Sequence, residues 1–249
     1  MRRIAAIGIV GALLFSCASR DAADPSRFEK ADLFGMIYDE ENQPCPGVML
    51  RVDGKSSGPA DEPVSDIRGR FVIPGLSRGE HSVTARKVGF EEVSTTILFL
   101  NRTDVLFLRM VSFAQLLGKA EKALEERRWG EADDLLARAE RLDPGSSVLV
   151  YLKAVAAYKT GHAEDAADQL AGLVQKGIHE PAVYLFLADV YEHGLADVPQ
   201  AIQVLEQYLA FRADEAALRR LESLRSREAA AREGEGLNEL PQAGQQSSN

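Results

Sequence analysis

The chain has 249 residues, of which 45% are hydrophobic and 27% are charged, and this length and composition exclude disorder throughout and allow one or two folded domains. A formal net charge of −9 argues against a general nucleic-acid-binding protein, because contacts to phosphates require a basic face. Two cysteines and four histidines leave little material for a zinc site or a disulfide framework.

The first residues have the pattern of an export signal. Arg2 and Arg3 precede a mainly apolar run from residue 4 to residue 15, which has the length of a signal-peptide core and is too short to span a bilayer. Residues 1–16 are therefore predicted to be a signal peptide. Residues 17–32 are mostly small and polar, and we expect them to form a tether ahead of the first domain.

The apolar run ends in Leu14-Phe15-Ser16-Cys17, which resembles the lipobox of bacterial lipoproteins. The resemblance implies that Cys17 is lipidated and becomes the first residue of the mature protein, with more than one acyl chain as the membrane anchor. It also implies a place in the bacterial cell envelope, either on the outer membrane facing the periplasm or on the surface. The alternative is ordinary secretion with an incidental cysteine.

Short apolar runs separated by turn residues predict β-strands between residues 33 and 110. Pro74-Gly75 is one of the predicted turns. Several short strands at this spacing favour an antiparallel β-sandwich, and Phe71, Phe99 and Phe107 fall in apolar runs where we expect them to be buried. The runs are residues 35–38, 48–52, 71–73, 81–85 and 96–100.

The motifs of this region add a family to the strand pattern. Gly35-x-Ile37-x-Asp39 is followed by residues 44–48 (PCPGV), 65–73 (SDIRGRFVI) and 87–90 (KVGF). In order and spacing these motifs resemble the carboxypeptidase regulatory-like family, which has a transthyretin-like β-sandwich. The resemblance implies an appended module over residues 33–110 with no catalytic group of its own. Cys45 lies where that family usually has an apolar residue, so it is either a packed small hydrophobe or a reactive or intermolecular thiol.

A 34-residue period replaces the strand pattern from residue 111 onward. It relates Ala120, Ala154 and Ala188, and it predicts pairs of helices with small residues where the helices approach. The pattern resembles tetratricopeptide repeats, about three of them over residues 111–214. The last half-repeat comes one residue late, which places an extra residue in the connection 194–200.

The end of the chain has two predicted parts. Residues 215–233 are amphipathic and are expected to form a capping helix. Residues 234–249 are rich in glycine, glutamine and serine and are predicted to be a disordered tail. The fold class is therefore multidomain α and β, an antiparallel β-sandwich followed by an α-helical repeat solenoid.

No catalytic constellation stands out. The sequence lacks a phosphate-binding loop, a nucleophile elbow and a zinc-protease motif, so we expect neither an enzyme nor a cofactor. His162 and His193 fall at similar places in neighbouring repeats, but two imidazoles alone make a poor metal site.

What remains is binding. In tetratricopeptide arrays the first helix of each repeat lines a concave groove, and the resemblance implies that groove here. Tyr151 and Tyr158 are expected in its middle, Glu121, Asp189 and Glu192 on its flanks, and Lys159 at its edge. The alternative for both tyrosines is packing against neighbouring helices.

Two functions follow from these expectations. The first is a membrane-anchored envelope lipoprotein that acts as an interaction or assembly scaffold, whose groove binds a peptide segment of another envelope protein with a basic residue between apolar ones. The second is a surface lipoprotein whose β-sandwich binds glycans or cell wall. It ranks lower because sugar-binding faces need exposed aromatic residues, and the phenylalanines of the sandwich are expected to be buried.

Overall fold

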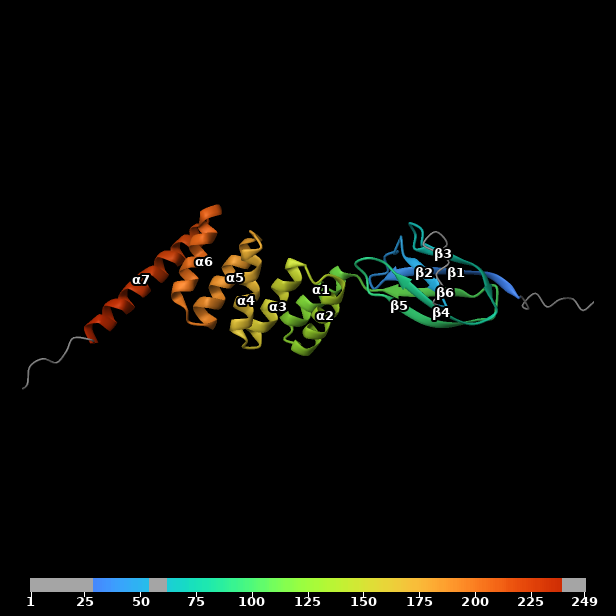
Figure 1. Ribbon diagram of the computed structural model, residues 1–249, viewed down its shortest axis with the longest axis horizontal. Helices are drawn as coiled ribbons and strands as arrows, with labels where there is room; N and C mark the ends of the chain where they lie inside the picture. The colour runs from blue at the N-terminus through green and yellow to red at the C-terminus, as the bar shows by residue number, and fades with distance from the viewer. Residues whose placement is uncertain (1–28, 54–61, 239–249) are drawn as a thin grey trace, which may run out of the picture.

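The computed structural model describes residues 29–53 and 62–238, which form an elongated molecule with strands at one end and helices at the other (Figure 1). The predicted fold class, a β-sandwich followed by a helical solenoid, is confirmed. The predicted signal peptide, Cys17 and most of the predicted tether lie outside the described residues. Within the described residues, no helix combines the length and apolar character needed to cross a membrane.

The sandwich consists of two three-stranded sheets, with strand orders β3-β1-β6 and β2-β4-β5. Leu33, Ile37, Leu50, Phe71 and Val83 are among the residues that fill the space between them. The strands are β1 (Lys30–Asp39), β2 (Met49–Val52), β3 (Arg70–Ser77), β4 (Gly79–Arg86), β5 (Val93–Phe99) and β6 (Val105–Met110).

One strand pairing differs from the antiparallel prediction. β1 pairs with β6 in parallel, from Phe34 opposite Val105 to Asp39 opposite Met110, whereas the other strand pairs are antiparallel. Consecutive strands joined by a short turn must run antiparallel, but β1 and β6 are the first and last strands of the sandwich and are free of that constraint.

The predicted turn at Pro74-Gly75 is also wrong, because β3 continues through it. The register of β1 against β3 shifts between Ala31 and Leu33. Gly75 has a φ of +59°, and its N–H donates to Asp32 Oδ1 at 2.9 Å. The Pro-Gly pair is therefore accommodated as a bulge, which places a proline and a glycine inside a strand.

Burial of the phenylalanines follows the expectation only in part. Phe71 and Phe99 are buried, but Phe107 is 66% exposed on β6. Its run of apolar residues correctly indicated a strand, yet the alternation of side chains places Phe107 on the outer face of the sheet. Cys45 is buried in the core of the sandwich, as the packed-hydrophobe alternative expects.

The helices form three antiparallel pairs followed by one long helix (Figure 1). Ala120, Ala154 and Ala188, related by the 34-residue period, are fully buried, which lets the helices approach closely. The helices are α1 (Phe113–Glu125), α2 (Trp129–Leu142), α3 (Ser147–Lys159), α4 (Ala163–Gln175), α5 (Pro181–Asp189), η1 (Val190–Gly194), α6 (Val198–Phe211) and α7 (Glu215–Asn238).

The extra residue of the third pair lies earlier than predicted. η1 is a single π-helical turn that continues α5, and the Leu195 N–H donates to the Val190 carbonyl at 3.0 Å, five residues back. A π turn is what one residue inserted into an α-helix produces. The helix itself therefore absorbs the insertion before the connection begins.

α7 covers the end of the array and buries Ala217, Leu221 and Leu224. It ends at Asn238, five residues beyond the predicted end of the capping helix. Residues 234–238 are therefore helical and not part of a disordered tail, because extending a helix already docked by its first turns requires no new nucleation. Residues 239–249 lie outside the described residues.

Candidate functional site

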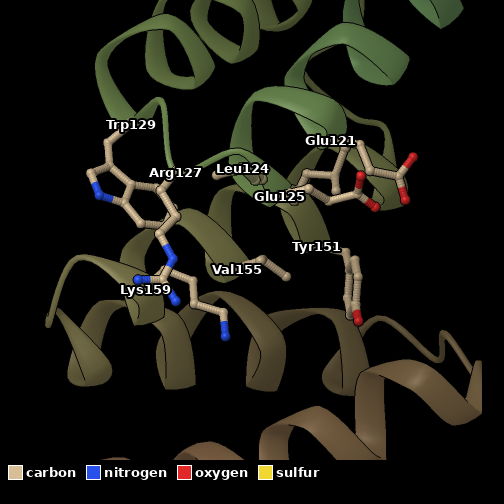
Figure 2. A pocket seen from close by; sticks show the side chains of 9 residues that line it. Glu121, Leu124, Glu125, Arg127, Trp129, Tyr151, Val155 and Lys159 are labelled. Carbon is tan, nitrogen blue, oxygen red and sulfur yellow. The ribbon is translucent and has the colours of Figure 1, made fainter.

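The surface between α1 and α3 carries a hollow of about 670 Å³, which falls within the size range of ligand pockets. Leu124, Leu152 and Val155 give it an apolar floor. α1 and α3 are the first helices of two successive pairs, so the hollow lies where the sequence placed the concave groove (Figure 2). We call it the α1–α3 groove.

The charged residues of the α1–α3 groove are separated by sign. Figure 2 shows Arg127 and Lys159 with Trp129 on one side, and Glu121 and Glu125 on the other. Arg127 occupies the turn between α1 and α2 with a φ of +58°, and its N–H donates to the Leu124 carbonyl. The groove therefore has a basic end and an acidic end separated by apolar side chains.

Tyr151 lies at the acidic end of the groove. Burial raises the pKa of its hydroxyl, and the nearby carboxylates of Asp189 and Glu121 raise it further. Its ring also meets Phe186 of α5 edge-on, with centroids 5.8 Å apart. Tyr151 thus both lines the groove and joins α3 to α5.

Tyr158 does not line the groove and has a packing role. Its ring lies edge-on to Phe186, with centroids 5.5 Å apart. A Cβ atom built onto Gly194 would come within 2.9 Å of the same ring. The alternative reading, packing against a neighbouring helix, is therefore correct for Tyr158.

Asp189 and Glu192 are the largest correction to the predicted site, because α7 binds both carboxylates. Arg220 contacts Asp189 (Nη1–Oδ1 2.6 Å) and Glu192 (Nη2–Oε2 2.8 Å), and Arg227 Nη1 lies 2.8 Å from Glu192 Oε1. The Glu192 side chain is only 8% exposed. These carboxylates hold the last helix in place and leave the acidic end of the groove to Glu121 and Glu125.

The environment of Glu192 favours its charged form. Burial alone would raise the pKa of the carboxyl group, but hydrogen bonds from Arg220 and Arg227 outweigh it and lower the pKa. Glu192 also lies inside the π turn η1. The alignment of residues 34 apart assumes that each helix is an uninterrupted α-helix. The π turn breaks that assumption, so the alignment does not predict which way Glu192 points.

α1 also fixes the groove to the sandwich. The Phe113 N–H donates to the Gly89 carbonyl at 2.8 Å, and the Glu91 N–H donates to the Val111 carbonyl at 2.9 Å. Ser112 begins α1 with a capping box completed by Gln115. No stretch of unpaired chain separates the last strand from the first helix.

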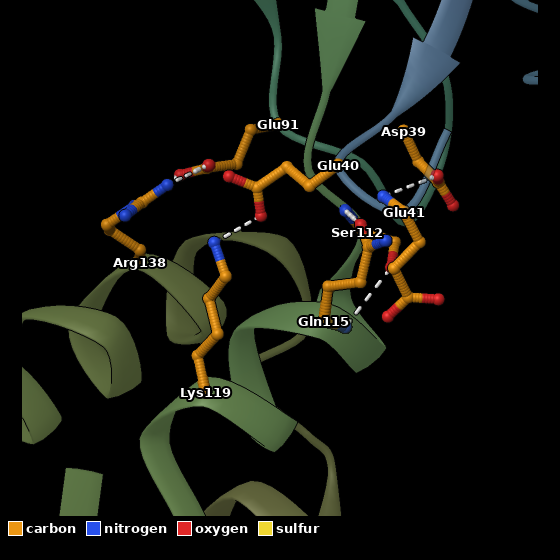
Figure 3. Close-up of polar contacts among 8 residues, drawn as sticks. All are labelled: Asp39, Glu40, Glu41, Glu91, Ser112, Gln115, Lys119 and Arg138. Carbon is orange, nitrogen blue, oxygen red and sulfur yellow. Dashed lines mark hydrogen bonds and ion pairs between the residues drawn. The ribbon is translucent and has the colours of Figure 1, made fainter. Parts of the chain in front are cut away.

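Two ion pairs cross the same boundary (Figure 3). Lys119 of α1 binds Glu40, and Arg138 of α2 binds Glu91 with 2.9 Å between Nε and Oε1. The hydrogen bonds from Arg138 lower the pKa of Glu91, although burial opposes the shift. The two ion pairs reach the sandwich from different helices. They therefore resist rotation of the helical part relative to the sandwich about the single chain segment that connects them.

The comparisons with known proteins agree with this division of the chain. Residues 32–109 match the carboxypeptidase regulatory-like domain. No curated protein sequence matched the chain. The matched residues are thus those of the β-sandwich described above, and the α1–α3 groove lies outside them, in the helical part.

Solved structures similar to the chain include several tetratricopeptide (TPR) domains. The first TPR domain of Spaghetti, bound to an HSP90 peptide, is 19% identical, covers 47% of this chain and 95% of its own, and has a TM-score of 0.42. The Sgt2 TPR domain from Aspergillus fumigatus is 18% identical over 55% of this chain and 90% of its own, with a TM-score of 0.44. A TPR-repeat protein from Bacteroides fragilis is 17% identical over 50% of this chain and 56% of its own, with a TM-score of 0.41.

Among the charged and aromatic residues that line the groove, sequence reasoning missed Glu125, Arg127 and Trp129. Arg127 and Trp129 belong to or follow the turn after α1, and columns built from the first helix of each repeat exclude them. Trp129 is the single tryptophan of the chain, and its place directly after a turn was the available signal. Among the described residues, no group of three or more His, Cys, Asp or Glu side chains is placed to hold a metal ion.

Proposed function

We propose that this chain is a protein-interaction scaffold whose α1–α3 groove binds an extended segment of a partner protein. The observation that carries the proposal is the separation of charge along an apolar floor. A basic side chain of the partner faces Glu121 and Glu125, and an acidic group faces Arg127 and Lys159. Apolar contact with the floor supplies affinity, and the charges at the two ends set the direction of the segment.

Cross-linking in the native cell tests this proposal. A photo-reactive amino acid at Val155, in the floor of the groove, is expected to capture a defined partner, while the same group at exposed Arg141 on α2 does not. Lys159→Glu is expected to weaken the capture, because it removes the basic end. Equal capture at both positions, or no effect of Lys159→Glu, would contradict the proposal.

We further propose that Cys17 anchors the chain to a membrane of the bacterial cell envelope. The support is the lipobox-like end of the predicted signal, Leu14 to Cys17. Cells supplied with labelled palmitate should incorporate the label into the wild-type chain and into Cys45→Ala, but not into Cys17→Ser. The Cys45 variant controls for labelling of a thiol in general, and equal labelling of Cys17→Ser would exclude the anchor.

The glycan-binding alternative gains one feature from the structure. Phe34 and Phe107 of the sandwich are both more than half exposed, so exposed aromatic residues are present after all. Their paired neighbours on the sheet, Val72, Met36 and Val105, have none of the hydroxyl or amide groups that hydrogen-bond to sugars. The nearby hydroxyl of Tyr38 already donates to Met36 Sδ. This surface therefore favours a protein contact.

A further inference from the structure

The two outer faces of the sandwich differ in chemistry. On β2-β4-β5, the central strand β4 turns Glu80, Ser82 and Thr84 outward, as expected of a face in water. On β3-β1-β6, the outward side chains include Phe34, 51% exposed, and Val105, 49% exposed. The β3-β1-β6 sheet therefore has apolar side chains on both faces. One face packs in the core of the sandwich, and the other is left exposed to water.

The strand register arranges the outer side chains of β3-β1-β6 in rows. Phe34 pairs with both Val72 and Val105, so these three lie in one row across the sheet. Met36 pairs with both Arg70 and Phe107, which makes the next row. Adjacent rows of paired residues on one face are close enough for large side chains to touch, so the apolar residues of the two rows form one continuous patch with Arg70 at its edge.

This face carries both a hollow and a projection. The hollow, of about 670 Å³, is bounded by Phe34, Val64, Val72 and Val105. Phe107 does not line it and is the most exposed of the aromatic residues on this face, at 66%. A surface that offers a projecting ring and a recess for a ring is complementary to itself, which is the requirement of a twofold contact between identical chains.

The charges on the face have the same property. Arg70 is paired with Asp66, with 2.7 Å between Nη2 and Oδ2, and both side chains remain partly exposed. Because the Arg70–Asp66 pair is neutral overall, a second copy turned by 180° can set Asp66 of one chain beside Arg70 of the other. A partner carrying charge of a single sign would leave one of the two opposed by a like charge.

We infer that two copies of this chain associate through the outer face of β3-β1-β6, with Phe107 of each copy seated in the recess of the other. The contact buries an apolar face that water otherwise covers. It leaves the α1–α3 groove of each copy free, since the groove belongs to the helical part. The dimer therefore presents two binding grooves and goes beyond the scaffold function proposed for one chain.

Sedimentation of the full chain tests the inference. The wild-type chain is expected to be dimeric, and Phe107→Glu monomeric. Leu98→Glu is the matched control, because Leu98 is 62% exposed on the outer face of the other sheet, and it should remain dimeric. A monomeric wild-type chain, or dimers that survive Phe107→Glu, would overturn the inference. So would a monomer that binds peptidoglycan through Phe107.

A mixing experiment separates the projection from the recess. Phe107→Ala removes the projection, and Val64→Trp fills the recess, so each variant alone should dimerise at least about tenfold more weakly than wild type. Mixed in equal amounts, they rebuild one of the two contacts, and the heterodimer should form more readily than either homodimer. Failure of the mixture to exceed the single variants would show that Phe107 does not enter the recess.

Discussion

Glu192 combines three features that seldom occur together in one surface helix: a buried carboxylate, two arginine partners and a π-helical backbone. A buried charge is tolerated only when its partners replace the water that it loses. Arg220 and Arg227 meet that need from α7. The carboxylate predicted to bind a partner protein is instead occupied by the chain's own last helix.

Replacing Glu192 with Gln is therefore expected to destabilise the helical part by about 2–3 kcal/mol, because charge-assisted hydrogen bonds are lost and Arg220 keeps a reduced set of partners. Urea unfolding followed by helical circular dichroism measures the change. Glu215→Gln is the control, since its pair with Arg219 is exposed on both sides, and its loss should cost less than about 0.5 kcal/mol. Equal effects would show that the burial of Glu192 has no energetic weight.

His81 makes the sandwich sensitive to pH. Its Nδ1 lies 2.8 Å from Asp53 Oδ2, and its Nε2 lies 2.8 Å from the Ser77 carbonyl. Burial alone would lower the pKa of the imidazole, but hydrogen bonds to Asp53 and Ser77 outweigh it and the pKa is raised above 6.5. The protonated ring donates to both acceptors.

The sign of the resulting effect follows from linkage. A group whose folded pKa is raised stabilises fully below its unfolded pKa, near 6.5 for histidine, and the contribution disappears as pH rises through the folded value. The free energy of unfolding of the sandwich should therefore fall as pH increases above about 6.5. The same titration in His81→Gln should lack this decline, and a decline of the same size in both would assign it to another group.

At the level of elements, the sequence correctly predicted what depends on local pattern. The alternation of apolar residues located strands, and the 34-residue period located helix pairs with buried alanines. The Pro-Gly pair in β3 was wrongly predicted to be a turn, because proline and glycine are common both in turns and in bulges within a strand. Phe107 misled because alternation gives two faces without saying which one meets water.

The candidate site shows the same division. Column transfer placed Glu121, Tyr151 and Lys159 in the groove, where the structure has them. It failed for Asp189 and Glu192 because their arginine partners come from α7, whose contacts no period within the repeats describes. An analysis that considers one helix at a time cannot predict contacts with side chains from an element later in the chain.

α7 is predicted to be an integral layer of the array. Leu221→Ala truncates a side chain that is 4% exposed and should cost about 2–4 kcal/mol, the usual loss for a core leucine. Leu218→Ala, three residues earlier on the same helix, changes a side chain that is 46% exposed and should cost under about 1 kcal/mol. Thermal unfolding of the full chain compares them, and similar melting temperatures would show that α7 is only loosely attached.

At the level of the whole molecule, the two parts keep separate cores but share a bonded boundary. The core of the sandwich and the first core of the helical part have no buried residue in common. The boundary is instead polar, made by main-chain hydrogen bonds and the ion pairs of Lys119 and Arg138. Such contacts fix the orientation of the two parts relative to each other but change the free energy of unfolding little.

Removing both ion pairs, in Lys119→Ala with Arg138→Ala, should therefore loosen orientation and leave stability almost unchanged. Distances between spin labels on Thr96 and Asp165, which lie in different parts of the chain, should become more widely distributed, while the melting temperatures stay within about 2 °C. Replacing Arg86 and Arg225, whose ion pairs stay within one part each, should leave the distances as they are. Unchanged distances in the double variant would assign the orientation to the main chain alone.

The parallel pairing of β1 with β6 has a mechanical consequence. β1 begins at the end of the molecule far from the helices, and β6 ends where the helices begin (Figure 1). Tension applied along the molecule pulls these neighbouring strands in opposite directions along their length, so the hydrogen bonds from Phe34 to Met110 bear the load together. An antiparallel pair with both ends on one side would open one bond at a time. Stretching the molecule therefore loads the β1–β6 pair in shear, the geometry in which its hydrogen bonds must break together. We expect the sandwich to stay folded while it transmits a force applied at the groove.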